Sequence, residues 1–441
     1  MNTSVSTSRR IDPLERETIR RVAWRLMPLL ILGYFCAYLD RANVGMAALT
    51  MNKQLGFSNA VFGFGAGVFF FGYFLAEIPS NLVLNKVGAR LWIARILITW
   101  GVISGLTAFV WSDWSFYTIR FILGAAEGGF FPGAILYMTW WFPSYYRARM
   151  FGMFSSAAVV SLFIGPPIGG LLLLMNGIGG LAGWQWLFII EALPAIAMAV
   201  VMWRLLTDRP AQAEWLRPEQ RTWLTERLAS ERAQQEAVRK FTLAGAFSSR
   251  TLWLITIAYF GNQMWSYGVS FFLPLIVKGL GVGTNWIGLL SGLPYLAALV
   301  AMNYWGWHSD RTGERTWHVA SAWLLSSAGM AACILVGPGY PAVVMVGLTF
   351  AVIGPWAMAP AFWSLPSALL TGTAAAGGIA MIGAVGQLGS WFGPTLFGLV
   401  KDATGSDTTA LLCLALAPVI STVLVVAAGH DRRMERIPPR A

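Results

Sequence analysis

The sequence predicts an all-α, polytopic membrane protein with twelve transmembrane helices arranged in two pseudo-symmetric six-helix halves. Three observations support this fold class: long apolar segments recur along the chain, basic residues alternate between successive loops, and short motifs repeat. The chain has 441 residues, of which 56% are hydrophobic and only 12% are charged. Soluble domains carry about twice that charged fraction. A stretch of about 18 or more apolar residues is long enough to cross a bilayer as a helix.

Polar turn signals divide the apolar sequence into twelve segments. Examples of these signals are residues 55–58, 142–144 and 404–406. The first segment follows a polar, arginine-rich stretch and is too long for the core of a signal peptide, so we expect an uncleaved first helix. The expected spans are 23–49, 60–84, 90–111, 114–140, 147–174, 184–206, 250–278, 284–307, 316–336, 340–369, 373–399 and 407–428.

The placement of basic residues predicts the orientation of these helices. Of the 31 lysines and arginines, only Lys53, Lys278 and Lys401 fall in the loops after the first, seventh and eleventh spans. Arg41 and Arg120 lie within spans, and the others lie in the tails, in the alternate loops or at helix ends facing them. Basic loops stay on the cytoplasmic side, so we expect both termini and the long central loop there. The net charge of +11 therefore reflects membrane topology, and we expect no nucleic-acid partner.

The longest polar stretch, residues 207–249, separates the two expected halves. Pro218 begins a run that carries Trp223, Leu224 and Leu228 at helical spacing. We expect an amphipathic helix on the cytoplasmic membrane surface, without a catalytic role. The expected domains are an N-terminal six-helix bundle with its N-terminal tail (1–206), the cytoplasmic loop (207–249) and a C-terminal six-helix bundle with its C-terminal tail (250–441).

Two motifs occur once in each half, at nearly the same shift along the chain. A charged, glycine-containing motif precedes the third and ninth expected helices, where it can form a charge latch with a neighbouring helix. A glycine-proline motif lies in the fifth and eleventh helices, where it provides a kink and a flat face for sliding. The first motif consists of Asn81, Asn85, Lys86, Gly88 and Arg90 and of Gly306, Asp310, Arg311, Gly313 and Arg315; the second consists of residues 165–170 and 393–398.

This architecture and the motif from Gly306 to Arg315 resemble the major facilitator superfamily. Finer stretches are similar to its anion:cation symporter branch, which includes permeases for tartrate, galactonate, glucarate, phthalate and related acids. The resemblance covers essentially the whole chain and implies a proton-coupled importer of a small organic anion, working by alternating access. It also implies a monomer in a bacterial inner (plasma) membrane, and the matching stretches are similar to those of tartrate-type permeases. The matching stretches are residues 38–45, 77–81, 86–90, 120–133, 208–210 and 215–216.

Four charged residues within the spans form the candidate transport site. Charges in the bilayer core cost several kcal/mol unless they are paired or hydrated. Arg120 and Glu127 are seven residues apart, which places them on one helix face about 10 Å apart along the axis. Asp40 and Arg41 are neighbours and point about 100° apart. A guanidinium matches a carboxylate with two hydrogen bonds, and a partly buried carboxyl group can carry a proton, so binding of an organic anion and of a proton can be coupled.

The resemblance assigns roles to these residues. It implies proton coupling by Asp40 and Glu127, anion binding by Arg41 and Arg120 or their pairing with those acids, and a substrate hydrogen bond from Tyr73. For the two other acids in the spans, Glu77 and Glu191, we expect structural roles. We expect the loop motifs to act as a conformational gate, with a weaker latch in the first half, where Asn85 replaces the usual aspartate. The gate residues are Lys86, Gly88, Arg90, Asp310, Arg311, Gly313 and Arg315.

Polar and aromatic residues of the second half complete the expected cavity. A group in the seventh helix lies one repeat away from Asp40 and Arg41 and should face the same cavity. Gly383 stands where relatives often have an asparagine, which leaves room and removes a hydrogen bond. The sugar-acid specificity of those relatives is therefore not expected to transfer directly. The candidates of the second half are Asn262, Gln263, Trp265, Tyr267, Trp356 and Gln387.

Other functions fit the sequence less well. Aromatic carboxylates of the phthalate or hydroxyphenylacetate type would suit the aromatic residues as well as hydroxy acids do, and antiport or uniport stays open. A membrane sensor would need no proton couple, which the presence of both Asp40 and Glu127 argues against. The sequence has no metal-ligand cluster, no nucleophile-base-acid set in the spans and no ATP-binding loop. We therefore expect no enzyme, no metal and no cofactor, with a proton as the coupling ion.

Overall fold

The computed structural model describes residues 12–237, 249–337, 339–369 and 372–429, and every regular element among them is a helix. The first half and the central loop contain α1 (Pro13–Leu55), α2 (Asn59–Val87), α3 (Ala89–Leu106), α4 (Asp113–Glu127), α5 (Phe130–Trp141), α6 (Ser144–Leu173), α7 (Gly183–Leu205) and α8 (Pro218–Ala237). The second half contains α10 (Arg250–Gly279), α11 (Thr284–Thr312), α12 (Thr316–Val336), α13 (Pro341–Ala357), α14 (Ala359–Phe362), α15 (Ser364–Leu369), α16 (Gly372–Thr404) and α17 (Asp407–Ala427).

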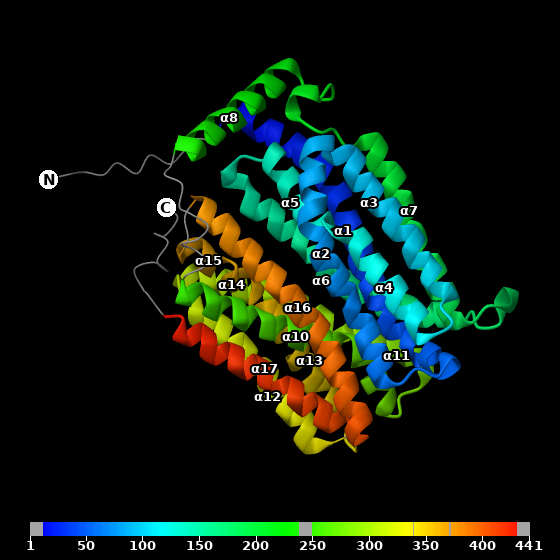
Figure 1. Ribbon diagram of the computed structural model, residues 1–441. Coiled ribbons are helices and arrows are strands. Elements are labelled where there is room, and N and C mark those ends of the chain that lie inside the picture. Colours follow the sequence, from blue (N-terminus) through cyan, green and yellow to red (C-terminus); the bar gives the residue numbers. More distant parts are fainter. Residues whose placement is uncertain (1–11, 238–248, 338, 370–371, 430–441) are drawn as a thin grey trace.

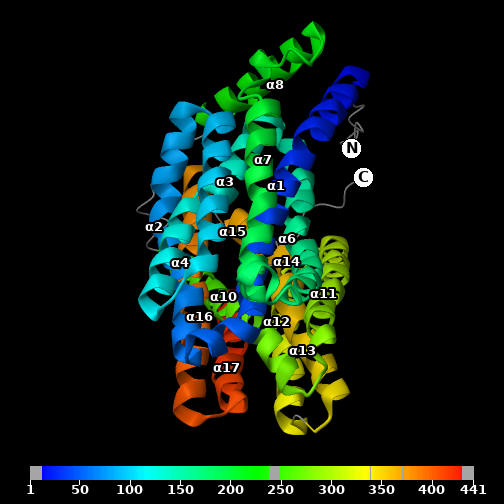
Figure 2. The same cartoon turned by 90° about the vertical axis from the view of Figure 1, so that its right-hand side faces the viewer.

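The helices have the length and composition of membrane spans. Ten helical stretches of the described residues are long and apolar enough to cross a bilayer. α10 and α16, with 30 and 33 residues, run beside each other, and α16 also runs beside α2. The long helices lie roughly along one direction, as Figure 2 shows. Exposed Leu, Ile, Val and Trp side chains are frequent on them, as expected where lipid surrounds a protein.

Polar residues at the loops set where several helices begin. The side chain of Ser58 accepts a hydrogen bond from the Val61 amide at the start of α2, and Ser112 and Ser115 form a reciprocal cap at the start of α4. Such side chains satisfy backbone N–H groups that the first helical turn leaves without partners. The turn signals in the sequence therefore coincide with real helix boundaries.

The fourth expected span, 114–140, is broken. α4 ends at Glu127 and α5 begins at Phe130. Gly129 between them has φ 96°, and a Cβ atom there would lie 2.2 Å from Oγ of Ser80 on α2. Only glycine adopts this backbone conformation without strain. The break places Glu127 at the end of a half-helix, a common feature of transporter sites.

The tenth expected span, 340–369, is also divided, into α13, α14 and α15, with Pro355 and Pro360 close to the first break. Proline lacks the N–H that would continue the helical ladder, so a helix bends or stops near it.

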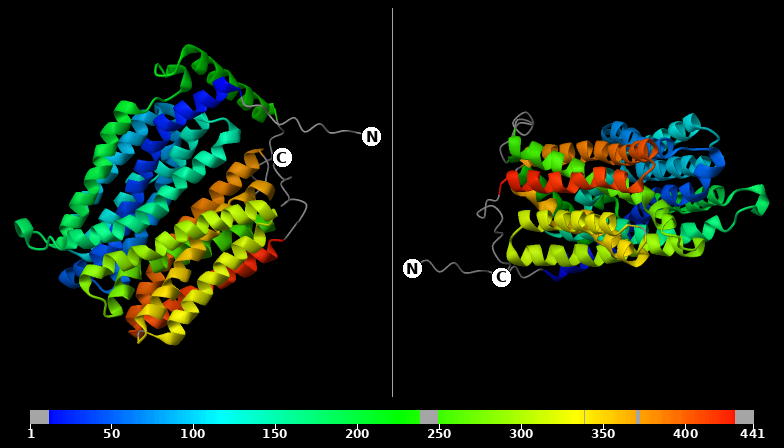
Figure 3. Two further views of the ribbon diagram at one scale, coloured as in Figure 1. Left: turned by 180° about the vertical axis from the view of Figure 1, so that it is seen from behind. Right: turned by 90° about the horizontal axis from the view of Figure 1, so that it is seen from below.

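The two halves meet at one end and diverge at the other. Glycine-proline segments form the contact: a Cβ on Gly63 of α2 would lie 2.2 Å from the Pro394 carbonyl oxygen of α16, and one on Gly288 of α11 would lie 2.4 Å from the Pro166 carbonyl oxygen of α6. The repeated motifs at 165–170 and 393–398 thus lie where helices of different halves touch. The ribbons diverge toward the end that carries α8 (Figures 1 and 3). Such flat contacts permit a rocking motion between halves.

Helix α8 belongs to the central loop and lies across one end of the first half (Figure 1). Leu224 is fully buried, and Trp223 and Leu228 pack against the same core. Glu231 of α8 accepts a hydrogen bond of 2.9 Å from the Ser144 amide at the start of α6. The predicted amphipathic helix is therefore present and docks on the protein; residues 238–248 of the predicted loop lie outside the described part.

Asp402 at the end of α16 holds the closed end of the molecule together. Its carboxylate accepts hydrogen bonds from the Asn59 amide (3.2 Å), the Ala60 amide (2.7 Å) and the Asn59 side chain (2.7 Å) at the start of α2. An acid from the second half thus caps a helix of the first half, where the helix dipole favours negative charge. The contact exists only while the halves touch here.

We expect Asp402→Ala to favour the state that is open at this end. A helix cap contributes about 1 kcal/mol, so the equilibrium should shift about fivefold. Spin labels at Lys53 and Ala403 would report the distance between the halves. Asp407→Ala is the control, because Asp407 pairs at 2.6 Å with Lys401 of its own half. An unchanged distance distribution for Asp402→Ala would contradict the idea that Asp402 holds the two halves together at this end.

Candidate functional site: a buried arginine cluster between the two halves

An ion pair between α1 and α4 occupies the centre of the molecule. Nη2 of Arg41 donates a hydrogen bond to Oε1 of Glu127, and Nη1 donates to the Tyr267 hydroxyl of α10 at 3.3 Å. Arg41 and Glu127 are 6% and 1% exposed. The Tyr267 hydroxyl in turn lies 3.5 Å from the Tyr38 hydroxyl of α1. One guanidinium therefore connects three helices and both halves.

Aromatic rings surround this guanidinium. Its central carbon lies 4.8 Å from the ring centre of Tyr38 and 5.6 Å from that of Tyr73, with Phe69 and Phe70 at 5.5 and 5.9 Å. Ring faces attract cations, more strongly where water is excluded. The structure thus brings Tyr73, which we expected to bind substrate, next to Arg41. The rings hold the positive charge without neutralising it.

Arg120 on α4 is the second buried cation, and it makes no ion pair with any residue that the structure describes. It is 1% exposed, and its nearest hydrogen bond is a weak one of 3.4 Å from Nη2 to the Ala66 carbonyl. Its guanidinium carbon lies 4.9 Å from the ring centre of Phe69, and it interacts electrostatically with Asp40, Glu127 and Arg41. A buried charge without a direct partner is costly. An anion bound here would remove that cost.

Three polar atoms in this cluster have no hydrogen-bond partner among the described residues. They are Nε of Arg41, Nε of Arg120 and Oε2 of Glu127. Two donors and one acceptor are thus buried close to one another without partners. A small carboxylate with hydroxyl groups can satisfy both kinds of atom.

Asp40 is directed toward α3 and not toward the aromatic rings that surround the two arginines. Its carboxylate accepts hydrogen bonds from the Asn43 amide at 3.0 Å, from the Trp100 indole at 2.9 Å and from the Ser104 hydroxyl. The 100° separation of neighbouring helical positions explains why Asp40 and Arg41 lie on different sides of α1. Its expected role in proton coupling stays a prediction. Sequence reasoning did not identify Trp100 and Ser104, which carry no charge that would mark them.

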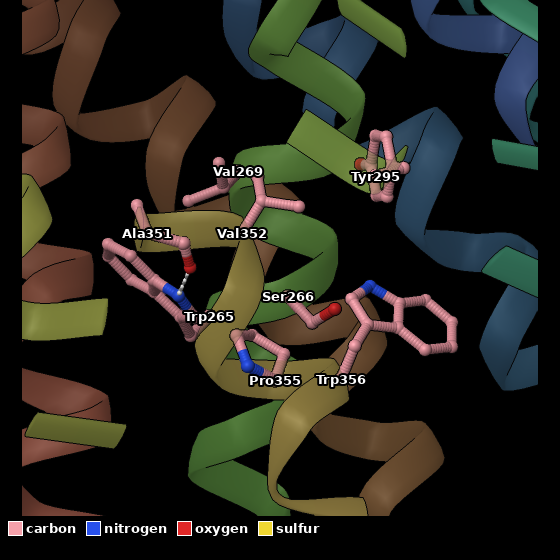
Figure 4. A pocket seen from close by; sticks show the side chains of 8 residues that line it. All are labelled: Trp265, Ser266, Val269, Tyr295, Ala351, Val352, Pro355 and Trp356. Atoms are coloured by element: carbon pink, nitrogen blue, oxygen red, sulfur yellow. Dashed lines mark hydrogen bonds between the residues drawn. The ribbon is translucent and has the colours of Figure 1, made fainter. Parts of the chain in front are cut away.

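Two of the aromatic candidates of the second half, Trp265 and Trp356, line a small pocket. Trp265, Ser266 and Tyr295 line it together with Trp356 of α13 (Figure 4). The Trp265 indole N–H donates to the Ala351 carbonyl at 3.1 Å and to the Ser326 hydroxyl at 2.9 Å, so its polar edge is occupied. The Trp356 ring lies 6.0 Å from the ring of Tyr38 in the first half. Trp356 is therefore placed near the arginine cluster, whereas the indole N–H of Trp265 serves packing of the second half.

Asn262, which we expected to face the central cavity, is buried, and its side-chain oxygen accepts a hydrogen bond of 2.8 Å from the Trp323 indole of α12. Its contact with substrate stays a prediction. Burial of the large Trp323 side chain requires a partner for its N–H, and Asn262 supplies it. Gln263 is directed toward α16, where its amide donates to the Ser390 hydroxyl at 3.4 Å.

Gly383 and Gln387 lie one turn apart on α16. A Cβ atom on Gly383 would meet nothing within 4 Å, whereas the neighbouring Gly386 touches Tyr259 and Gln263 of α10. Gln387 is half-buried. A side chain at position 383 would therefore begin in open space.

We expect Gly383→Asn to fold normally and to change substrate preference toward sugar acids. The Cβ of the new side chain would meet no atom within 4 Å, and its amide adds hydrogen-bonding groups worth about 0.5–1.5 kcal/mol each, which corresponds to a few-fold to about tenfold change in relative affinity. Competition of sugar acids against the preferred acid in uptake assays would measure it. Gly383→Ala, which adds volume without an amide, is the control; equal preferences for the two variants would contradict a contact between position 383 and substrate.

The gate residues form local contacts within each half. In the second half, Arg315 pairs with Asp310 at 2.6 Å and donates to Ser309 at 3.0 Å, while Gly313 has φ 69° at the end of α11. Arg311 lies over the Trp307 ring at 5.0 Å. Charge and turn geometry in this loop thus fix the junction of α11 and α12.

The first-half gate uses an acid from elsewhere in the chain. Oδ1 of Asp208, just after α7, accepts a hydrogen bond of 2.8 Å from the Arg90 amide, and Arg90 Nε donates to the Trp203 carbonyl at 2.6 Å. Gly88 has φ 99°, and Lys86 is exposed. Asp208 stands in for the acid that Asn85 does not provide. Its signal in the sequence was its place in the matching stretch 208–210.

Comparisons with known proteins agree with this geometry. The sequence profile of the Major Facilitator Superfamily matches residues 30–394. Two proteins of Agrobacterium vitis, each named "Putative tartrate transporter", are 48% and 46% identical over 94% of this chain and 92% and 95% of their own. The crystal structure of a bacterial homologue of the human lysosomal transporter Spinster has a TM-score of 0.77 at 16% identity, covering 96% of this chain and 99% of that one. The predicted twelve-helix, two-half membrane fold is confirmed by these matches.

Proposed function

Because this chain belongs to the Major Facilitator Superfamily and is a membrane transporter of organic acids, we propose that it imports tartrate or a related hydroxy acid together with protons. Transport follows alternating access, in which the halves rock about the arginine cluster. The coupling ion is the proton, no cofactor takes part, and a single chain suffices.

The observation that carries this proposal is the buried Arg120 guanidinium without an ion pair among the described residues, next to the Arg41–Glu127 pair. If Glu127 and Asp40 are both ionised, their two negative charges cancel the positive charges of the two arginines. An anion then gains little electrostatic binding energy from the cluster. A proton on Glu127 leaves an excess positive charge and frees Arg41. Anion binding and proton binding therefore favour each other through electrostatics.

The contact between Arg41 and Tyr267 supports coupling to the conformational change. Nη1 of Arg41, on the first half, donates to a hydroxyl of the second half at 3.3 Å. A carboxylate that binds Arg41 competes for this donor and alters a bond between the halves. Substrate occupancy and the relative position of the halves are thereby linked.

A second candidate substrate is an aromatic carboxylate. The rings of Tyr38 and Trp356 come from different halves and lie 6.0 Å apart at 66° beside the cluster. The two rings contact each other edge to face, and the aromatic surface that they form can pack against the ring of such an acid. An acid of the phthalate or hydroxyphenylacetate type would place its carboxylate on the arginines and its ring against this surface.

Uptake by purified protein in liposomes with an inward proton gradient tests both candidates. We expect tartrate to accumulate and the accumulation to collapse with a protonophore. Accumulation of phthalate or hydroxyphenylacetate without tartrate would favour the aromatic substrate. Thermal stabilisation by an acid that never accumulates would contradict symport and favour a sensor.

The proposed location is the bacterial inner membrane, with the α8 end in the cytoplasm. The basic residues concentrate in the tails and loops of that end. A cysteine at the exposed Glu226 position of α8 should react with an impermeant maleimide only in permeabilised cells. Labelling in intact cells would overturn this orientation.

A further inference from the structure

Glu191 on α7 is a buried acid for which the transport site described above has no use. The residue is 4% exposed, and neither of its carboxyl oxygens has a hydrogen-bond partner of normal geometry. An ionised carboxylate without hydrogen bonds in the membrane interior costs several kcal/mol relative to water. The protonated form avoids most of this cost and has an O–H to donate.

An acceptor for that O–H lies next to it. Glu191 lies beside the side chain of Asn43 on α1 and feels the negative charge of Asp40. Asn43 is 1% exposed, and its side-chain oxygen also has no partner, whereas its NH₂ group donates to Asp40 at 3.0 Å. A proton on Glu191 would supply the donor that the Asn43 oxygen lacks.

The two carboxyl groups have opposite surroundings. Asp40 accepts three hydrogen bonds, from Asn43, Trp100 and Ser104. Glu191 accepts none. Asp40 is the charged group that acts on Glu191; α3 contributes the neutral Trp100 and Ser104, and α1 contributes Cys36, which lies near Asp40. The packed helix α6 contributes Ser161, whose hydroxyl donates to the Phe35 carbonyl.

We propose that Glu191 is a second proton-binding residue of this transporter, linked to Asp40 through the side-chain amide of Asn43. The Asn43 NH₂ donates to Asp40, so a proton on Glu191 could be donated to the Asn43 oxygen, which has no other partner among the described residues. Transfer of the proton to Asp40 would reverse the amide, because its NH₂ must face whichever carboxylate is charged. The amide thus couples two protonation states, and α1 carries their effect to Arg41.

The proposal rests on the proposed proton symport. The experiment below distinguishes failure of the Glu191 proposal from failure of proton symport itself. Across a gradient of about one pH unit, each coupled proton supports about tenfold accumulation. If Glu191 carries one of the coupled protons, Glu191→Gln accumulates about tenfold less substrate at equilibrium. Its exchange of external for internal substrate, which needs no net proton movement, should stay within about twofold of the parent. Glu77→Gln, a half-buried acid on α2, is the matched control and should leave accumulation unchanged.

Infrared difference spectroscopy gives a readout that does not depend on transport. The parent protein should show the C=O stretch of a protonated carboxyl group that disappears in Glu191→Gln and shifts in Asn43→Ala, where the acceptor is lost. If the parent does not accumulate any acid but the band is present, proton symport fails and the proton site stands. If parent symport works and Glu191→Gln keeps both full accumulation and the band, the proposal is overturned.

Discussion

Arg120→Ala is expected to lose substrate binding by a factor of about 30 or more. Truncation of one partner of a buried, hydrogen-bonded charge pair costs about 2–5 kcal/mol, and each 1.4 kcal/mol is tenfold. Arg120 has no carboxylate partner among the described residues, so the bound anion would be its partner. Thermal stabilisation of the purified protein by tartrate, or by whichever acid the uptake assay identifies, measures the loss.

The free protein distinguishes a binding role from a structural one. Removal of an unpaired buried charge relieves a desolvation cost, so Arg120→Leu should unfold at an equal or higher temperature than the parent without ligand. Arg120→Lys keeps the charge but loses the planar fork and should bind about tenfold more weakly. Normal ligand binding by the alanine variant, or a marked loss of stability in the leucine variant, would show that Arg120 serves packing.

Much of the fold follows from the sequence because the bilayer imposes simple rules. Backbone groups in lipid must be satisfied within helices, so apolar length identifies the spans and basic loops their direction. The helix breaks after Glu127 and Ala357 were not predicted from the sequence, because glycine and proline also occur inside continuous membrane helices. What makes Gly129 a break is the approach of Ser80 from α2, a contact between helices that no local pattern encodes.

The site was predictable where its geometry lies within one helix. Seven-residue spacing placed Arg120 and Glu127 on one side of α4, and both are buried there. The choice of partners between helices was not predictable. Arg41, rather than Arg120, forms the ion pair with Glu127, and the Trp323 indole donates a hydrogen bond to the side-chain oxygen of Asn262. Helical spacing says that Asp40 and Arg41 diverge but not which of them faces the second half. Only packing of α1 against α3 and α10 decides that.

Glu127→Gln is expected to stop gradient-driven uptake while sparing substrate binding and exchange. The amide keeps the shape of the side chain and can still accept a hydrogen bond from Arg41, but it cannot bind or release a proton. Loss of the negative charge frees part of the Arg41 guanidinium, so affinity for the anion should be unchanged or higher. Accumulation under a proton gradient and exchange without one, measured on the same liposomes, separate these effects.

Combination with Arg41→Ala tests whether the two residues act as a pair. The single Arg41→Ala change leaves the Glu127 carboxyl buried without its cation, so it should lower the unfolding temperature more than the double change does. Pairs in direct contact commonly couple by about 0.5–3 kcal/mol, whereas independent residues add within a few tenths. Additive effects on stability, together with normal gradient-driven uptake by Glu127→Gln, would mean that the Arg41–Glu127 contact plays no part in coupling. The coupling proton would then bind elsewhere, with Asp40 and Glu191 as the other fully buried acids within the expected spans of the first half.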